Sequence, residues 1–292
     1  MTLWQEYRRP KNLSEALQAL TSAPRPVLPI AGGTDLLIEL QQGHHAPTHT
    51  LVDLNSVDEM TALEVRDDEL FIGAAVPVNR IVASDFVLRH AQALVQAADL
   101  IGGPQVRNTA TLGGNVAHAL PAADGTIALV ALDAQAEIAS LKGVRRIPIQ
   151  GLFAGPGKSI LKSGEELLVG FHIRKKNNNG QASAFKRIMR PQGVALPIIN
   201  LAIWLQSEKE TIADIRIAIG PAGPTPLRAT GAEDILRGQK FDEAILERAL
   251  EALLAQAKFR TSPQRASAEY RRHLVAVLFK DTLAAAWGRA NQ

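Results

Sequence analysis

Two glycine pairs, each beside polar residues, are the first features of this sequence that could carry chemistry. The first is Ala31-Gly32-Gly33-Thr34-Asp35-Leu36, which follows the short apolar run 27–30 and precedes a helical pattern. Glycine lets a backbone approach a ligand closely, and successive N–H groups at a strand-to-helix turn can bind an anion. A tight turn capped by Thr34 or Asp35 explains the same residues. The charge of Asp35 opposes a phosphate contact, so we expect it to cap backbone N–H groups or to bind ligand hydroxyls.

The second glycine pair lies in a longer polar segment, Gln105 to Asn115. Thr111 can donate its hydroxyl to a phosphate, and Gly113 and Gly114 clear space for a ligand. Asn115 offers both a donor and an acceptor, and Asp124 can accept hydrogen bonds from ribose hydroxyls. A purely structural loop rarely needs all of these groups together, so the segment favours a phosphate- and ribose-bearing ligand.

Composition excludes several other kinds of site. The chain has no cysteine, so it cannot hold an iron–sulfur cluster or a Cys-ligated zinc by itself, and redox chemistry would need a bound organic cofactor. A formal charge of +3 and 4% aromatic residues predict no nucleic-acid binding. No apolar run approaches the roughly 18 residues of a membrane span, so we expect a cytoplasmic protein.

Two further motifs resemble known binding sites but lack residues that those sites require. Gly157-Lys158-Ser159 could end a P-loop, but Leu152 stands where its first glycine is required, and Pro156 removes an N–H group. His44, His45 and His49 have no carboxylate at confirming spacing, which predicts a surface turn rather than a metal site. We therefore expect no metal site and no catalytic side chain.

The elements that must position the glycine pairs alternate in the first 75 residues. A helix is expected over 14–20 with Ser14 as its cap, and strands are expected over 27–30, 51–54 and 70–75. Helical patterns cover 79–84 and 87–100. The segment 101–115 lacks a helical period and is predicted to be a long ordered loop or a series of turns.

The clearest linker is Lys175-Lys176-Asn177-Asn178-Asn179-Gly180, and we place a domain boundary there. Beyond it, apolar runs over 182–188, 198–205 and 211–219 predict a three-stranded antiparallel sheet. Helical patterns over 231–236, 241–258 and 267–286 follow. Strands followed by helices are typical of an α+β domain.

These motifs and their spacing resemble the FAD-binding medium subunit of the xanthine dehydrogenase and carbon monoxide dehydrogenase (molybdenum hydroxylase) family. The resemblance implies an α+β fold: a two-lobed FAD-binding domain of the PCMH-like type over 1–175, with subdomains of about 1–57 and 58–175, and a C-terminal domain over 176–292. The residues that carry it are 31–34, 105–115, 121–124, 164–168 and Phe185-Lys186.

The resemblance also implies which residues contact FAD. The first loop should wrap the pyrophosphate, and the second should approach it and the isoalloxazine from another side. Leu168 matches a backbone contact on a strand, and Lys186 matches a lysine near the flavin. The sequence departs from the family at Pro191-Gln192-Gly193-Val194-Ala195, which leaves the contacts at the flavin edge open. The complete set of implied FAD residues is Ala31, Gly32, Gly33, Thr34, Asp35, Leu36, Ile101, Thr111, Gly113, Gly114, Asn115, Asp124, Leu168 and Lys186.

The function implied is that of an electron-transfer subunit in an oxidoreductase. Its partners would be a small [2Fe-2S] iron–sulfur subunit and a large molybdopterin subunit, in a dimer of heterotrimers. The chain would accept electrons from the iron–sulfur clusters and pass them to NAD or another acceptor. Two other functions fit the same residues: a stand-alone flavin-dependent oxidoreductase, and a non-redox nucleotide-binding assembly module.

Overall fold

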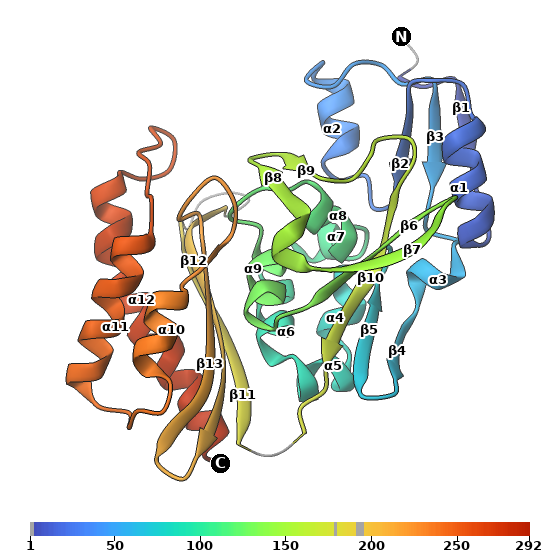
Figure 1. Ribbon diagram of the computed structural model, residues 1–292. Coiled ribbons are helices and arrows are strands. Elements are labelled where there is room, and N and C mark those ends of the chain that lie inside the picture. The colour runs from blue at the N-terminus through green and yellow to red at the C-terminus, as the bar shows by residue number, and fades with distance from the viewer. Residues whose placement is uncertain (1–2, 178–179, 191–195) are drawn as a thin grey trace.

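The structure is a computed structural model that describes residues 3–177, 180–190 and 196–292. It contains two lobes followed by a third, helix-covered sheet (Figure 1). The departure at Pro191-Ala195 lies outside the described residues.

The first lobe is a small parallel sheet with strand order β1-β3-β2. The predicted strand over 27–30 is confirmed as β2, and its end leads directly into the first glycine pair. Helix α1 begins at Leu13, one residue earlier than expected. Its cap is Asn12, whose side chain accepts a hydrogen bond from the Glu15 N–H at 2.9 Å, so the prediction of Ser14 as the cap was wrong. The elements of this lobe are β1 (Glu6–Arg8), α1 (Leu13–Ser22), β2 (Val27–Ile30), α2 (Leu36–Gln41) and β3 (Thr50–Asp53).

The second lobe is a five-stranded antiparallel sheet with order β4-β5-β10-β6-β7, packed against short helices. The predicted helix over 87–100 is divided at Ala91, whose backbone is not helical. The strands are β4 (Leu63–Arg66), β5 (Glu69–Gly73), β6 (Gln135–Ser140), β7 (Gly143–Pro148) and β10 (Leu167–Arg174), with a hairpin of β8 (Phe153–Gly155) and β9 (Lys158–Ser159). The helices are α3 (Asp58–Thr61), α4 (Val78–Val82), α5 (Asp85–His90), α6 (Gln92–Asp99), α7 (Pro104–Arg107), α8 (Leu112–Ala117), α9 (Asp124–Ala131) and the 3-10 helix η1 (Ile149–Leu152).

The segment 101–115 is not the continuous loop that its composition suggests. It forms one turn of helix in α7 and then enters α8, so the prediction of a loop without helices was wrong. Leu112 and Val116 are fully buried on the inner face of α8. Burial of these two side chains offsets the poor helix propensity of the glycine pair between them.

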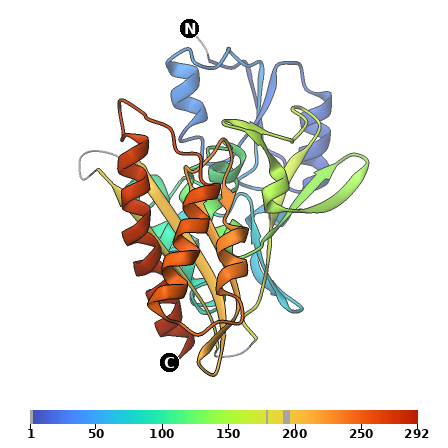
Figure 2. The ribbon, with the colours of Figure 1, turned by 60° about the vertical axis from the view of Figure 1, so that its left-hand side comes forward.

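The C-terminal part contains the three predicted antiparallel strands in the order β11-β12-β13, extended by a two-residue strand, β14. The sheet therefore has four strands rather than three. Helices cover one of its faces and stand side by side in Figure 2, whereas α6 and α9 of the second lobe pack on the other face. The elements are β11 (Gln181–Met189), β12 (Pro197–Glu208), β13 (Thr211–Gly220), β14 (Leu227–Arg228), α10 (Thr230–Leu236), α11 (Glu243–Gln256) and α12 (Ala268–Ala290).

Two hydrophobic cores result. One fills the first two lobes and includes the inner faces of β5, β10, α6 and α9, and the other lies between the C-terminal sheet and its helices. Within the described residues, no helix is both long and apolar enough to cross a membrane.

Candidate functional site

The two glycine pairs, about 80 positions apart in the sequence, belong to loops that touch. A Cβ atom added to Gly32 would overlap the carbonyl oxygen of Thr109 and lie 2.8 Å from the Cα atom of Ala110. Gly33 has a φ of +66°, a left-handed conformation that favours glycine. Backbone sterics therefore account for both glycines of the first pair, and the turn is held against the segment that enters α8.

The first loop presents backbone donors. Within the described part of the chain, no protein acceptor is found for the N–H groups of Gly32, Gly33, Thr34 and Asp35. The carbonyl of Ala31 is instead held by the Asn55 amide at 3.0 Å. A row of partly exposed N–H groups without protein acceptors is the donor set that an anion requires.

Asp35 does not cap α2. Its backbone is helical and its side chain accepts no capping hydrogen bond, so this part of the expectation was wrong. The carboxylate lies 3.8 Å from His118 Nδ1, and Glu39 lies 3.1 Å from His118 Nε2. His118 follows α8, so these contacts join α2 to α8.

In the second loop, Thr111 is the N-cap of α8. Its hydroxyl oxygen accepts a hydrogen bond from the Gly114 N–H at 3.1 Å. Gly113 packs on the end of β5, where an added Cβ would overlap Ala74 and where its N–H donates to the Ala74 carbonyl at 2.8 Å. Gly114, by contrast, is exposed. Gly113 therefore serves packing and the buried Thr111 caps the helix, whereas the exposed Gly114 leaves room for a ligand to approach the backbone.

Asn115 supplies a second indication of a ligand. Its side-chain oxygen Oδ1 is buried and has no hydrogen-bond partner among the described residues. A buried acceptor without a partner costs free energy unless water or a ligand satisfies it.

Asp124 is tied to the C-terminal domain. It forms an ion pair with Arg187, and it also accepts a hydrogen bond from the Asn200 amide at 2.7 Å. Burial raises the pKa of the Asp124 carboxyl, while Arg187 and Asn200 act in the opposite direction. The carboxylate predicted to accept ribose hydroxyls is thus already engaged by two strands of another domain.

The remaining predicted residues are more dispersed. Ile101 lies between α6 and α7 and packs on the main core. Leu168 is buried on β10 beside a β-bulge between Leu168 and Gly170. Lys186 lies on β11 and pairs with Asp281 of α12 at 3.5 Å, on the face of the sheet that α12 covers. The structure therefore brings the 31–36 loop and 109–115 together, whereas Lys186 faces a different element.

The motifs do not point to Arg187 or Asn200, and they give His118 no role, although all three residues connect the predicted site to its surroundings. Arg187 and Asn200 are isolated polar residues on apolar strands. Asn200 is fully buried and the Arg187 side chain is 7% exposed. A buried polar residue on a strand is itself a signal, but the sequence gives no indication of its partner.

Comparisons with known proteins agree with this geometry. The family described as the FAD binding domain in molybdopterin dehydrogenase matches residues 3–174, and the CO dehydrogenase flavoprotein C-terminal domain matches residues 183–286. The xanthine dehydrogenase FAD-binding subunit of Escherichia coli O157:H7 is 35% identical, with 98% of this chain and 97% of that protein covered. The carbon monoxide dehydrogenase medium chain of Hydrogenophaga pseudoflava is 29% identical, with 97% of each chain covered.

A solved structure has the same fold. It is carbon monoxide dehydrogenase from Hydrogenophaga pseudoflava, in a form that lacks the Mo-pyranopterin moiety of the molybdenum cofactor. Its similarity to this chain has a TM-score of 0.91 at 28% identity, with 98% of each chain covered.

Fold and site together define a flavoprotein subunit of an oxidoreductase. The chain belongs to the family of FAD-binding subunits of molybdenum-containing dehydrogenases, the xanthine and carbon monoxide dehydrogenase family. The resemblance noted in the sequence is confirmed, and FAD is the cofactor.

Proposed function

We propose that this chain relays electrons inside a larger complex, from the iron–sulfur clusters of a small [2Fe-2S] partner to NAD or another acceptor. A large molybdopterin subunit would carry the substrate chemistry. The absence of cysteine supports this division of labour, because the chain cannot hold the clusters itself. The cytoplasmic location expected from the sequence and the domain boundary at 175/176 belong to the same proposal. The second hydrophobic core, which consists only of residues beyond that boundary, supports the division into domains.

The observation that carries the proposal is the meeting of the two glycine loops. The turn at Gly32 packs against the backbone of Thr109 and Ala110, which leads into α8, and no protein acceptor is found among the described residues for the four N–H groups of 32–35. The FAD pyrophosphate is the part of the cofactor that such donors suit. Ile101 and the backbone near Leu168 complete the proposed contacts.

When bound, FAD can collect electrons singly and release them as a pair, and the protein has only to hold and orient it. The first loop binds by its N–H groups, Asn115 offers its unpaired oxygen, and α8 is fixed by Thr111. Asp124 is proposed to contribute through the position of α9, which it joins to the C-terminal sheet. Lys186 would need to leave Asp281 in order to meet the flavin.

The electron path can be tested on the purified complex with and without this chain. With substrate and NAD present, the complete complex should reduce both its iron–sulfur clusters and NAD. Without this chain, the clusters should still be reduced, but NADH formation should stop. Continued NADH formation at the full rate in the absence of the chain would contradict the proposed relay.

The isolated chain separates this proposal from the two other functions. A stand-alone oxidoreductase would turn over a small substrate as a single chain. A non-redox assembly module would bind no FAD in calorimetry. The proposed subunit should bind FAD and show no substrate turnover until its partners are added.

A further inference from the structure

A second cavity lies between the second lobe and the C-terminal domain, away from the glycine loops. It is a groove of about 540 Å³ at the start of β11, in the lower part of Figure 1, whereas α2 and α8 lie in the upper half. None of the residues that line it is an aspartate or glutamate, and four of them are basic: Arg89, His90, Lys176 and Arg289.

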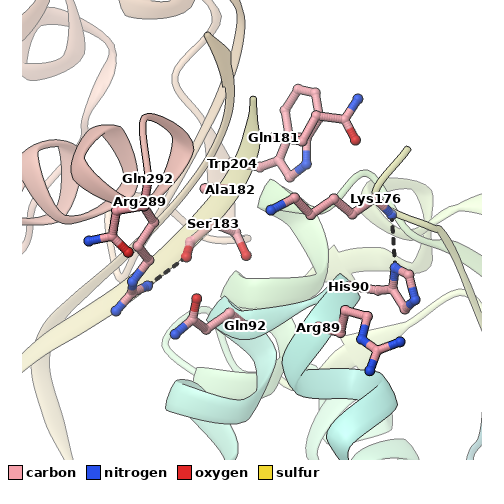
Figure 3. A pocket seen from close by; sticks show the side chains of 10 residues that line it. All are labelled: Arg89, His90, Gln92, Lys176, Gln181, Ala182, Ser183, Trp204, Arg289 and Gln292. Carbon is pink, nitrogen blue, oxygen red and sulfur yellow. Dashed lines mark hydrogen bonds between the residues drawn. The ribbon is translucent and has the colours of Figure 1, made fainter. Parts of the chain in front are cut away.

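The basic residues come from three separate parts of the chain. Arg89 and His90 end α5, Lys176 lies in the interdomain linker, and Arg289 is near the end of α12 (Figure 3). Among the residues that the structure describes, no carboxylate of an Asp or Glu lies within 4.0 Å of the cationic groups of Arg89, Lys176 or Arg289. The side chains that line the groove therefore offer these positive charges no acidic partner.

The local geometry holds several of these groups in place. Arg289 donates to the Ser183 carbonyl at 2.7 Å and to the Gln96 side chain at 3.2 Å. The N–H of Lys176 donates to His90 Nδ1 at 3.1 Å, and the Lys176 side chain extends across the groove toward β11 (Figure 3). Because Nδ1 of His90 accepts, a neutral His90 ring presents its other nitrogen as a donor.

The electrostatic environment of His90 is consistent with this positive potential. Burial lowers the pKa of His90, and Arg89, Lys175 and Lys176 lower it further. Burial also lowers the pKa of Arg289, with no opposing carboxylate. An anion in the groove would favour the charged forms of His90 and Arg289 and so oppose the lowering of both pKa values.

We propose that this groove is a second ligand site, separate from the flavin loops, that takes a phosphate-bearing small molecule. Guanidinium, ammonium and imidazole donors together suit a phosphate, which accepts several hydrogen bonds at once. The volume lies within the roughly 300–1,000 Å³ of small-molecule pockets and exceeds the size of a bare ion. The partly exposed indole of Trp204 offers a flat apolar wall for the remainder of such a ligand.

Because of the position of the groove, a bound ligand would contact both domains and the linker between them. An occupant would touch the second lobe through Arg89, the linker through Lys176 and the C-terminal domain through Arg289. Helix α6 starts at the groove with Gln92 and leads to Ile101 in the proposed flavin site. Bound phosphate would therefore restrain the two domains that the Asp124–Arg187 pair also joins.

The test is calorimetric titration of the full chain, with FAD bound, against inorganic phosphate and against AMP. We expect one site per chain and at least ten-fold weaker binding in Lys176→Gln and in Arg89→Gln. Among the described residues, neither the Lys176 nor the Arg89 side chain makes a hydrogen bond that the substitution would remove, so both variants should fold. Lys258→Gln is the matched control, because Lys258 is an exposed lysine of the C-terminal domain outside the groove. Its binding should be unchanged.

The two probes distinguish the possible sources of the anion. Tighter binding of AMP than of phosphate assigns a phosphorylated ring compound, and equal binding assigns the phosphate group alone. Absence of binding, or equal binding in wild type and Lys176→Gln, would overturn the proposal. A third result would also overturn it: phosphate binds to the free chain but no longer binds in the assembled complex. In that case an acidic segment of a partner would occupy the groove. Retained FAD absorbance in every variant keeps these outcomes separate from failure of the flavin site.

Discussion

Gly32 and Gly113 must be glycine because a side chain at either position would overlap neighbouring protein atoms, whether or not a ligand is bound. Gly32 meets the backbone of 109–110, and Gly113 meets Ala74 at the end of β5. The same contacts that exclude a side chain bring the loops together. The glycine pairs thus allow the two loops to pack closely. This packing leaves the N–H groups of the first loop without protein acceptors among the described residues.

Replacement of Gly32 by alanine should therefore impair FAD binding. The added Cβ would force the first loop away from Thr109 and would shift the N–H groups of 32–35 with it. We expect at least a ten-fold loss of FAD affinity, measured by the ratio of flavin to protein absorbance and by calorimetry. Gly288→Ala is the control, because its Cβ would meet nothing within 4 Å on helix α12. Full flavin content in Gly32→Ala would show that the loop contact is unimportant.

The buried pair of Asp124 and Arg187 makes a second residue-scale prediction. Asp124→Asn keeps the shape but leaves the buried Arg187 without its counter-charge, which typically costs about 3–5 kcal/mol. Denaturant unfolding of the chain should show this loss of stability. Asp281→Asn removes the exposed partner of Lys186 and should cost less than about 1 kcal/mol. Equal effects of the two substitutions would argue against an interdomain tie at Asp124.

At the scale of elements, α8 links the glycine loop to the core. Thr111 caps the helix through its hydroxyl, while Leu112 and Val116 anchor it. Thr111→Val should destabilise the chain by about 0.5–2 kcal/mol through loss of the cap and should also weaken FAD binding. Thr111→Ser keeps the hydroxyl and should restore both properties. Stability and FAD affinity of the pair can be compared by unfolding and calorimetry, and equal FAD binding in both variants would remove Thr111 from the proposed site.

The same helix marks the limit of prediction from sequence. The apolar run at 27–30 predicts β2 correctly because a buried strand needs little more than continuous apolar residues. Helix α8 could not be predicted in this way, since Gly113 and Gly114 have low helix propensity and the helix depends on tertiary burial. The short strand β14 likewise depends on its pairing with β13 rather than on its own sequence.

The candidate site was predictable in part for a related reason. The glycine pairs and Thr111 stand in motifs whose order is informative, whereas Arg187 and Asn200 are single polar residues on strands. Nothing in the sequence pairs them with Asp124, because the contact joins positions 63 and 76 residues apart. Pairing across domains follows from the fold.

At the scale of the whole molecule, the chain binds FAD but has no cysteine with which to hold an iron–sulfur cluster. The glycine loops adjoin α2 and α8 in the upper half of Figure 1, whereas the basic groove lies at the start of β11 in the lower part. This arrangement suits a subunit whose domains hold a cofactor while other chains supply and remove electrons.

Mild purification of the native complex, with an absorption spectrum and metal analysis, tests this division of labour most directly. The chain should copurify with two other subunits, and the preparation should contain molybdenum, iron and FAD. Gly32→Ala should remove the flavin from the complex while molybdenum and iron remain. A native complex that contains neither molybdenum nor iron would contradict the proposed role.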